Sequence, residues 1–180
     1  MISYKNSKDV NMENIIIETE RLIIREFKED DIGEYFKMIS NDNVHKWLGD
    51  RKKKSIDDAK RIMLYFKNKF REEGRGVLAV VSKENGSLIG QVGVNYAPNL
   101  GCFEYLYAIA YEEWNKGYAT EIGIEFINYY RDRFKNEKIV AVVYPENLSS
   151  KKVLSKLNFD FKGQKEMFGG VLDYYELNLG

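Results

Sequence analysis

The sequence predicts a mixed α/β (α+β) fold, and three observations predict it. Two short β-branched runs in residues 76–96 are joined by "KENGS", whose Asn-Gly pair is a strong hairpin signal. Residues 101–111 alternate aromatic side chains, which predicts a third strand, and a helical stretch and the buried run "KIVAVV" follow. An antiparallel meander joined to a strand–helix–strand crossover favours a mixed sheet. The predicted order is β-α-α-β-β-β-α-β-α-β-β, with about seven strands and about four helices.

Apolar spacing predicts the elements of the N-terminal half. The first strand lies in "ETERLIIREFKEDD", and the acidic residues that end this segment suit a helix start. Helical spacing predicts a helix in "DDIGEYFKMIS" and a longer one in "SIDDAKRIMLYFKNKFREE", where Ser55 can cap the first turn. The longer helix has one apolar stripe, made of Ile56, Ala59, Ile62, Met63, Phe66 and Phe70.

Apolar spacing also predicts alternating helices and strands in the C-terminal half. The helix after Gly117 has a stripe of apolar side chains at positions 119, 122, 126 and 129, and "KIVAVVYPEN" predicts a buried strand. "LSSKKVLSKLNF" predicts a short helix capped by Asn147. The last segment predicts a hairpin with Gly169 and Gly170 near its turn.

Composition limits the classes of function. The net charge is zero, with 44% hydrophobic and 31% charged residues, so no strong overall field favours nucleic acid or a membrane surface as a partner. The basic run "RKKKS" is most simply a solvated face. With one cysteine and one histidine, the chain cannot form an internal disulfide, and we expect no metal site.

The chain shows no repeat, no linker rich in Gly, Ser or Pro, and no apolar run of 18 residues. Residues 1–12 are polar and lack the hydrophobic segment of a signal peptide. We therefore expect a flexible lead-in over 1–12, a single domain over 13–180, and a cytoplasmic location.

The stretch "YEEWNKGYATE" stands between a predicted strand and a predicted helix. The first N–H groups of a helix have no internal partner, and a glycine there lets an anion approach the backbone closely. Lys116 and Gly117 therefore suit a phosphate or pyrophosphate, although glycines also occur at helix starts that bind nothing. The two common nucleotide motifs, G-x-G-x-x-G and G-x-x-x-x-G-K-[ST], are absent, which disfavours a dinucleotide or ATP site.

The wider sequence resembles the GNAT N-acetyltransferases of the RimJ/RimL-like branch, over roughly residues 16–179. "WNKGYA" is similar to the family's pyrophosphate loop at Gly117 and Ala119, with Trp114 in place of the leading Gln or Arg. "FEYLYAIAYEEW" is similar to the family's fourth strand, and "ETERLIIREFKEDD" and "GGVLDYYELNL" to its opening and closing segments. "NLSSKKVLSKLNF" matches a further family segment, except that Asn158 replaces a glycine.

This resemblance implies a twisted, mostly antiparallel GNAT-like sheet and acetyl-CoA as the co-substrate. It implies that the pantetheine arm pairs with the backbone of Tyr107, Ala108 and Ile109, and that Asn147 hydrogen-bonds the same arm. The pyrophosphate would lie on the N–H groups of the loop, which are those of Asn115, Lys116, Gly117, Tyr118, Ala119 and Thr120. Lys151 or Lys152 could approach the adenosine phosphate, or both could be exposed to solvent.

The implied reaction is direct acetyl transfer to an amine, which needs a proton acceptor because free alkylamines titrate near pH 10. Glu104 is the candidate base, if its carboxylate is desolvated; the alternative is an outward carboxylate paired with a lysine. Many relatives protonate the departing thiolate with a tyrosine, but the matching position here is Leu154. We assign that role to Ser150, whose alternative is a local bond to the helix cap.

The resemblance therefore predicts an acetyl-CoA-dependent N-acetyltransferase acting on a primary amine, either a protein N-terminus or a small molecule. The alternative on the same fold is a non-catalytic acyl-CoA-binding sensor or interaction domain. We expect residues 41–55 and Tyr174 or Tyr175 to shape the acceptor site. The identity of the acceptor stays open, as does the oligomeric state, for which a dimer is possible.

Overall fold

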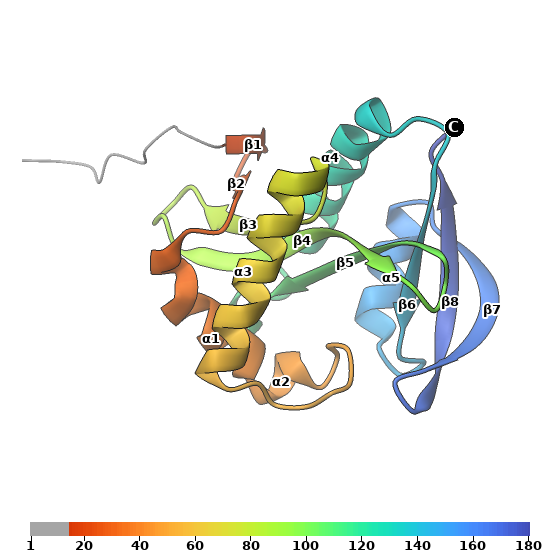
Figure 1. Ribbon diagram of the computed structural model, residues 1–180, viewed down its shortest axis with the longest axis horizontal. Coiled ribbons are helices and arrows are strands. Elements are labelled where there is room, and N and C mark those ends of the chain that lie inside the picture. Colours follow the sequence, from red (N-terminus) through yellow and green to blue (C-terminus); the bar gives the residue numbers. More distant parts are fainter. Residues whose placement is uncertain (1–14) are drawn as a thin grey trace, which may run out of the picture.

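The computed structural model describes residues 15–180, so the lead-in expected over residues 1–12 lies outside the described part. Helices cover both faces of one strongly twisted sheet (Figure 1). The strands are β1 (Ile15–Glu18), β2 (Leu22–Arg25), β3 (Val77–Ser82), β4 (Leu88–Ala97), β5 (Cys102–Ile109), β6 (Lys138–Val143), β7 (Asp160–Met167) and β8 (Gly170–Asn178). The helices are α1 (Ile32–Ser40), α2 (Asp42–His45), α3 (Ile56–Glu73), α4 (Tyr118–Arg133) and α5 (Leu148–Lys156), with short 3-10 turns at Glu29–Asp31 and Tyr111–Glu113.

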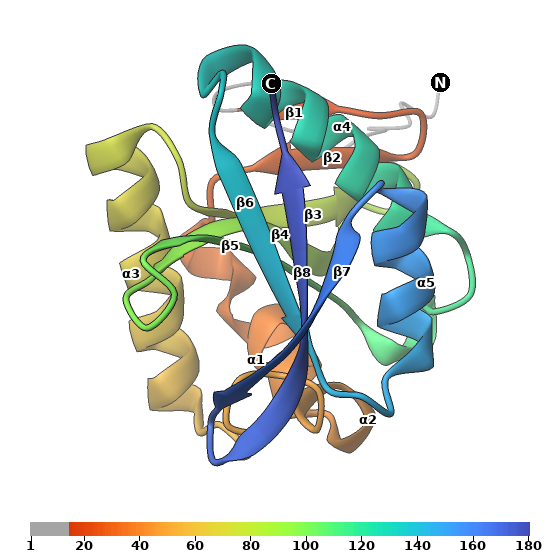
Figure 2. The same cartoon turned by 90° about the vertical axis from the view of Figure 1, so that its right-hand side faces the viewer.

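The sheet confirms the predicted mixed, mostly antiparallel topology. Its strand order is β1-β2-β3-β4-β5-β6-β8-β7. Every neighbouring pair is antiparallel except β5 and β6, which are parallel. A parallel pair needs a crossover connection, and α4 supplies it. Figure 2 shows that β6, β8 and β7 cross the direction of β3, β4 and β5, so the sheet opens between β5 and β6.

Residues 15–180 contain eight strands and five α-helices, one more of each than the predicted order. The additional strand is β1, four residues that pair with β2, and the additional helix is α2, also four residues long. Segments this short contain about one helical turn or two strand periods, so their apolar pattern has no period to detect.

Two apolar clusters fix which helices lie on which face. On one face, α4 and α5 pack through Ile122, Phe126 and Leu154 against the sheet. On the other, α1 and α3 pack through Tyr35, Met63 and Phe66. The two faces share β5 by alternation, because its odd-numbered aromatics join the α4–α5 cluster while Leu106 and Ala108 join the α1–α3 cluster.

The helix caps and turns have the backbone conformations that their residue types favour. Ser55 caps α3 in a reciprocal capping box with Asp58. Gly86 takes a positive φ of 73° in the "KENGS" hairpin, and Asn158 takes one of 62°. Within residues 15–180, no helix combines the length and the apolar character needed to span a bilayer.

Candidate active site

The site is centred on the place where β5 and β6 separate. The parallel pairing of these strands comprises only Phe103 with Ile139 and Glu104 with Val140. Beyond Glu104, β5 continues to Ile109 and pairs with β4 alone. One edge of residues 105–109 therefore faces an opening in the sheet.

Strand alternation decides which backbone groups of β5 face this opening. The N–H of Ala110 donates to the carbonyl of Ile89 on β4, which places the even-numbered residues of β5 in the hydrogen-bonded pairs with β4. The N–H and C=O groups of Tyr107 and Ile109 consequently point away from β4, toward the opening. Those of Ala108 point to β4, so the expectation that its backbone pairs with a ligand in the opening does not fit this register.

Glu104 lies at the point of separation, on the face that α1 and α3 cover. It shares this face with Leu106 and Ala108, which belong to the α1–α3 cluster. No hydrogen bond or ion pair reaches its carboxylate from any residue in 15–180, so the alternative of a lysine partner is not what the structure has. Burial raises the pKa of Glu104 from 4.5 to about 7. The carboxyl group is therefore partly buried, without a partner among residues 15–180, and able to exchange a proton near neutral pH.

The loop before α4 presents a row of free backbone donors. Gly117 is the N-cap of α4, has a φ of 83° and supplies no side-chain cap, and Asn115 also has a positive φ, of 62°. The first hydrogen bond of this helix is from the N–H of Glu121 to the carbonyl of Gly117. None of the N–H groups from Asn115 to Thr120 has an acceptor among the described residues. This concave row at a helix N-terminus fits a pyrophosphate.

Two side chains of the loop make contacts that the sequence did not reveal. Lys116 is paired with Glu113 at 2.7 Å, so its ammonium group is already neutralised within the loop. Trp114, which replaces a polar residue of the family pattern, donates its indole N–H to the carbonyl of Ile109 at 2.8 Å. The tryptophan thus ties the end of β5 to the loop and leaves the N–H of Ile109 directed at the opening.

Asn147 and Ser150 begin α5 beside the same strand. Asn147 is the N-cap, and its side-chain oxygen accepts the N–H of Ser150 at 3.1 Å. The hydroxyl of Ser150 does not bond back to the cap; it accepts the hydroxyl of Tyr107, with the two oxygens 3.2 Å apart. Burial raises the pKa of Tyr107, more than the bond to Ser150 lowers it, so this phenol stays protonated at neutral pH. The structure therefore places two linked hydroxyl groups next to the opening.

Two further positions of α5, Lys151 and Leu154, contact other parts of the protein. Lys151 forms an ion pair with Asp173 of β8 and does not extend freely into solvent. Leu154 is buried, with 1% of its surface exposed, which makes it a core residue.

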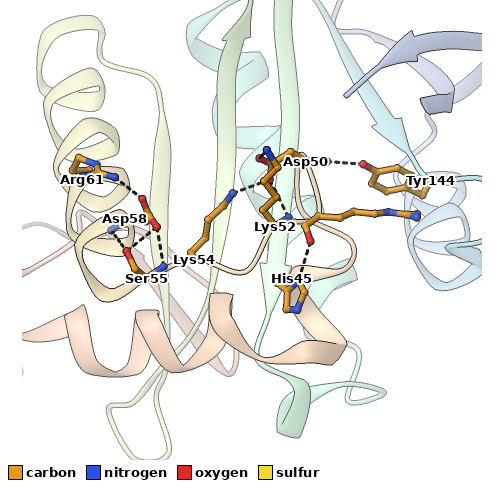
Figure 3. A network of polar contacts seen from close by, with 10 residues as sticks. His45, Asp50, Lys52, Lys54, Ser55, Asp58, Arg61 and Tyr144 are labelled. Atoms are coloured by element: carbon orange, nitrogen blue, oxygen red, sulfur yellow. Dashed lines mark hydrogen bonds and ion pairs between the residues drawn. The ribbon is translucent and has the colours of Figure 1, made fainter. Parts of the chain in front are cut away.

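The loop between α2 and α3 reaches the end of β6. Figure 3 shows Tyr144 beside this loop, and its hydroxyl donates to the carbonyl of Gly49 at 2.6 Å. The Arg51 guanidinium lies 3.3 Å from the centre of the Tyr144 ring and pairs with Glu146. His45 contacts the Arg51 carbonyl through Nδ1, 3.2 Å away. Tyr144 follows β6, so these contacts fix residues 46–55 at the end of the sheet toward which β5 and β6 diverge.

Of the two tyrosines expected near the acceptor, only one lies on the face of Glu104. Val140 is the partner of both Glu104 and Glu176, so Tyr174, two residues from Glu176, shares that face. Tyr175 points to the opposite face, where it joins the α4–α5 cluster. The difference follows from the two-residue period of β8, whose register the sequence does not reveal.

Sequence reasoning missed the hydroxyl of Tyr107, the contacts of Tyr144 and the side chain of Arg21, which binds the loop before α4. The alternation of aromatics in 103–107 placed Tyr107 on one face of a strand, but nothing in the sequence indicated that α5 faces it. Contacts between residues about 40 to 100 positions apart have no local pattern.

Comparison with known proteins agrees with this fold. Residues 21–160 match the family model described as an acetyltransferase (GNAT) domain. The chain is 32% identical over 162 residues to the uncharacterized N-acetyltransferase YoaA of Bacillus subtilis, covering 89% of this chain and 87% of that protein. A GNAT-family acetyltransferase from Bacillus anthracis superposes with a TM-score of 0.76 at 22% identity, covering 91% of this chain and 98% of that one. A RimL ribosomal alpha-N-protein acetyltransferase in complex with coenzyme A gives 0.77 at 14% identity, covering 92% and 98%.

Proposed function

The chain belongs to the GNAT acetyltransferase family, and from this premise we propose that it transfers the acetyl group of acetyl-CoA to a primary amine. The observation that carries the proposal is the unpartnered Glu104 carboxylate, with a pKa of about 7, at the point where β5 and β6 separate. The loop of free N–H groups from Asn115 to Thr120 binds the pyrophosphate, and Tyr107 and Ile109 offer backbone groups to the pantetheine arm. Asn147, as the cap of α5, stands at the same arm.

Glu104 is the base of this reaction. The amine nitrogen attacks the thioester carbonyl carbon with its lone pair, and the proton that the nitrogen must lose passes to the Glu104 carboxylate, directly or through water. A pKa near 7 leaves the carboxylate about half ionised at neutral pH, which gives a base stronger than an ordinary glutamate. The N–H of Ile109, held by the bond between the Ile109 carbonyl and Trp114, donates to the oxygen that becomes negative.

Ser150 and Tyr107 serve the leaving group. When the carbon–sulfur bond breaks, the sulfur departs with the electron pair as a thiolate and takes a proton from the Ser150 hydroxyl. Tyr107 donates to Ser150, so its hydroxyl can replace that proton through the existing bond. The phenol then regains a proton from water, to which Glu104 releases the proton that it took from the amine. The pair does the work that a single tyrosine does where relatives have one at the position of Leu154.

We expect Ser150→Ala to lower kcat for acetyl transfer about 10-fold to 100-fold, with the dissociation constant of acetyl-CoA nearly unchanged. Tyr107→Phe tests the same pair and should have a smaller effect, because Ser150 retains its own proton. Steady-state rates with thiol release as the readout, together with calorimetric binding, measure both quantities. Unchanged kcat in the Ser150 variant would remove the serine from the mechanism.

The proposed function is tested by ligand binding and turnover on the same preparation. At 100 times its dissociation constant, acetyl-CoA should stabilise the fold by about 2.7 kcal/mol, which a thermal melt detects. Thiol release should then depend on an added amine, in a panel that combines peptide N-termini, polyamines, aminoglycosides and free amino acids. Stabilisation without release for any amine would instead support an acyl-CoA-binding domain without catalysis.

We also propose that the protein belongs to the RimJ/RimL-like branch and that peptide N-termini are the first acceptors to examine. The support is the "TERLIIR" segment, the "NLSSKKVLSKLNF" segment and the fold shared with RimL. Fold does not choose an acceptor by itself, so the amine panel decides.

A further inference from the structure

The turn between β1 and β2 binds the loop that precedes α4, although about 100 residues separate them in the sequence. Figure 2 shows β1 and β2 beside α4. The Arg21 guanidinium donates through Nη1 to the carbonyl of Lys116 at 2.9 Å and lies 4.4 Å from the centre of the Tyr118 ring. A Cβ built on Gly117 would come within 3.5 Å of Nη2 of the same guanidinium. Arg21 therefore contacts Lys116 and Tyr118 and lies beside Gly117 between them.

Arg21 also neutralises a carboxylate in the first turn of α4. Glu121 accepts from Nε of Arg21 at 2.8 Å, from its backbone N–H at 3.1 Å and from the hydroxyl of Thr19 at 2.5 Å, and Nη2 pairs with it at 2.6 Å. Burial acts to raise the pKa of Glu121, but the bonds from Thr19 and Arg21 outweigh it and hold that pKa below its usual range.

This neutralisation matters because of where Glu121 lies. The free N–H groups of Asn115 to Thr120 make an anion site, and a carboxylate one residue further along the helix repels a bound anion unless a cation cancels its charge. Lys116 does not do so, since it pairs with Glu113. Arg21 provides the cancelling charge and at the same time fixes the Lys116 carbonyl, so the N–H groups on either side keep their direction.

We propose that Arg21 is a positioning residue for the pyrophosphate: it holds the loop in the binding conformation and cancels the charge of Glu121 toward the ligand. This inference rests on the proposed function, because the ligand is coenzyme A. Thr19, which donates to the same carboxylate, supports Arg21 in this role.

The test compares two acetyl donors that differ in the pyrophosphate. In Arg21→Met, the dissociation constant of coenzyme A and the KM of acetyl-CoA should rise about 10-fold. The KM of S-acetylpantetheine, which has no pyrophosphate, should stay within about twofold of the wild type, and so should the KM of the acceptor. Arg71→Met is the matched control, because Arg71 lies on α3, away from the loop, and forms an exposed ion pair with Glu26.

A residue that only stabilises the fold would weaken both donors alike, and that result, or unchanged coenzyme A binding, overturns the inference. If Arg21→Met does not fold, Arg21→Gln gives the same comparison, because glutamine also removes the positive charge and cannot make the forked contact with Glu121 and Lys116. Wild-type protein that does not bind coenzyme A would refute the proposed function itself. Wild-type binding with an unaffected variant refutes only the role of Arg21.

Discussion

Glu104→Gln should lower kcat/KM for acetyl transfer at pH 7 by a factor of about 100 or more, because a positioned general base contributes roughly 10²–10⁴. The dissociation constant of acetyl-CoA should not change, since no ligand contact is assigned to this carboxylate. In the wild type, kcat/KM should rise as the pH passes about 7, the pKa of Glu104, and the variant should lack this inflection. Rates from pH 5.5 to 9 with a single amine acceptor measure both effects.

The same substitution should stabilise the fold at alkaline pH. The pKa of Glu104 is about 7 in the folded chain against an ordinary 4.5, so the folded state holds the proton more tightly. Stability is unaffected below pH 4.5, falls as the pH rises from 4.5 to 7, and stays lower above pH 7 by about 3 kcal/mol. Glutamine does not ionise, so the variant should gain about this much over the wild type between pH 4.5 and pH 8 in chemical denaturation.

Glu176→Gln is the matched control for Glu104. Glu176 lies on the same face of the sheet, but the bond from Lys138 outweighs burial and lowers its pKa, so it cannot act as a base near pH 7. The kcat of the Glu176→Gln variant should stay close to that of the wild type. An unchanged pH profile in Glu104→Gln would show that another group accepts the proton.

Gly117→Glu should abolish acetyl-CoA binding while the protein remains folded. A negative charge about 5 Å from a phosphate costs about 3 kcal/mol at an effective dielectric constant of 20, which weakens binding more than 100-fold. The new side chain also has to adopt a φ of 83°, which costs the fold roughly 1–2 kcal/mol. Calorimetry with coenzyme A and a thermal melt of the same sample separate the two effects.

Gly74→Glu matches this substitution in charge and backbone strain. Gly74 ends α3 with a φ of 67°, and a Cβ there meets no atom within 4 Å. The control should lose a similar amount of stability and keep its affinity for coenzyme A. Retained binding in Gly117→Glu would place the pyrophosphate elsewhere.

Much of the fold followed from local periodicity. The hairpin at "KENGS", the Ser55 and Asn147 caps and the left-handed Asn158 depend on residues within a few positions of one another, so the sequence predicts them. The local pattern was incomplete where neighbouring elements decide how deeply a side chain is buried. The predicted stripe of α4 does pack against the core through Tyr129, but the adjacent Tyr130, whose ring meets Phe134, is the more deeply buried of the two.

Some features of the candidate site could likewise be predicted from the sequence, and others could not. Gly117 and the row of free N–H groups could be predicted, because a helix start after a strand exposes them whatever surrounds it. The raised pKa of Glu104 could be expected only conditionally, since it depends on how deeply the strand is buried. The link between Tyr107 and Ser150 could not be predicted, because it depends on where α5 docks.

The sequence by itself thus determined the mixed sheet, the order of its main elements, the family resemblance and the loop at Gly117, all of which are set by short-range chemistry. Only the tertiary structure decided that β5 and β6 part at Glu104, that Tyr107 and Ile109 rather than Ala108 face the opening, and that Arg21 neutralises Glu121 beside the loop. These features depend on strand register and on contacts between distant segments. A one-residue shift in register reverses every side chain of a strand, and no local pattern in the sequence fixes that shift.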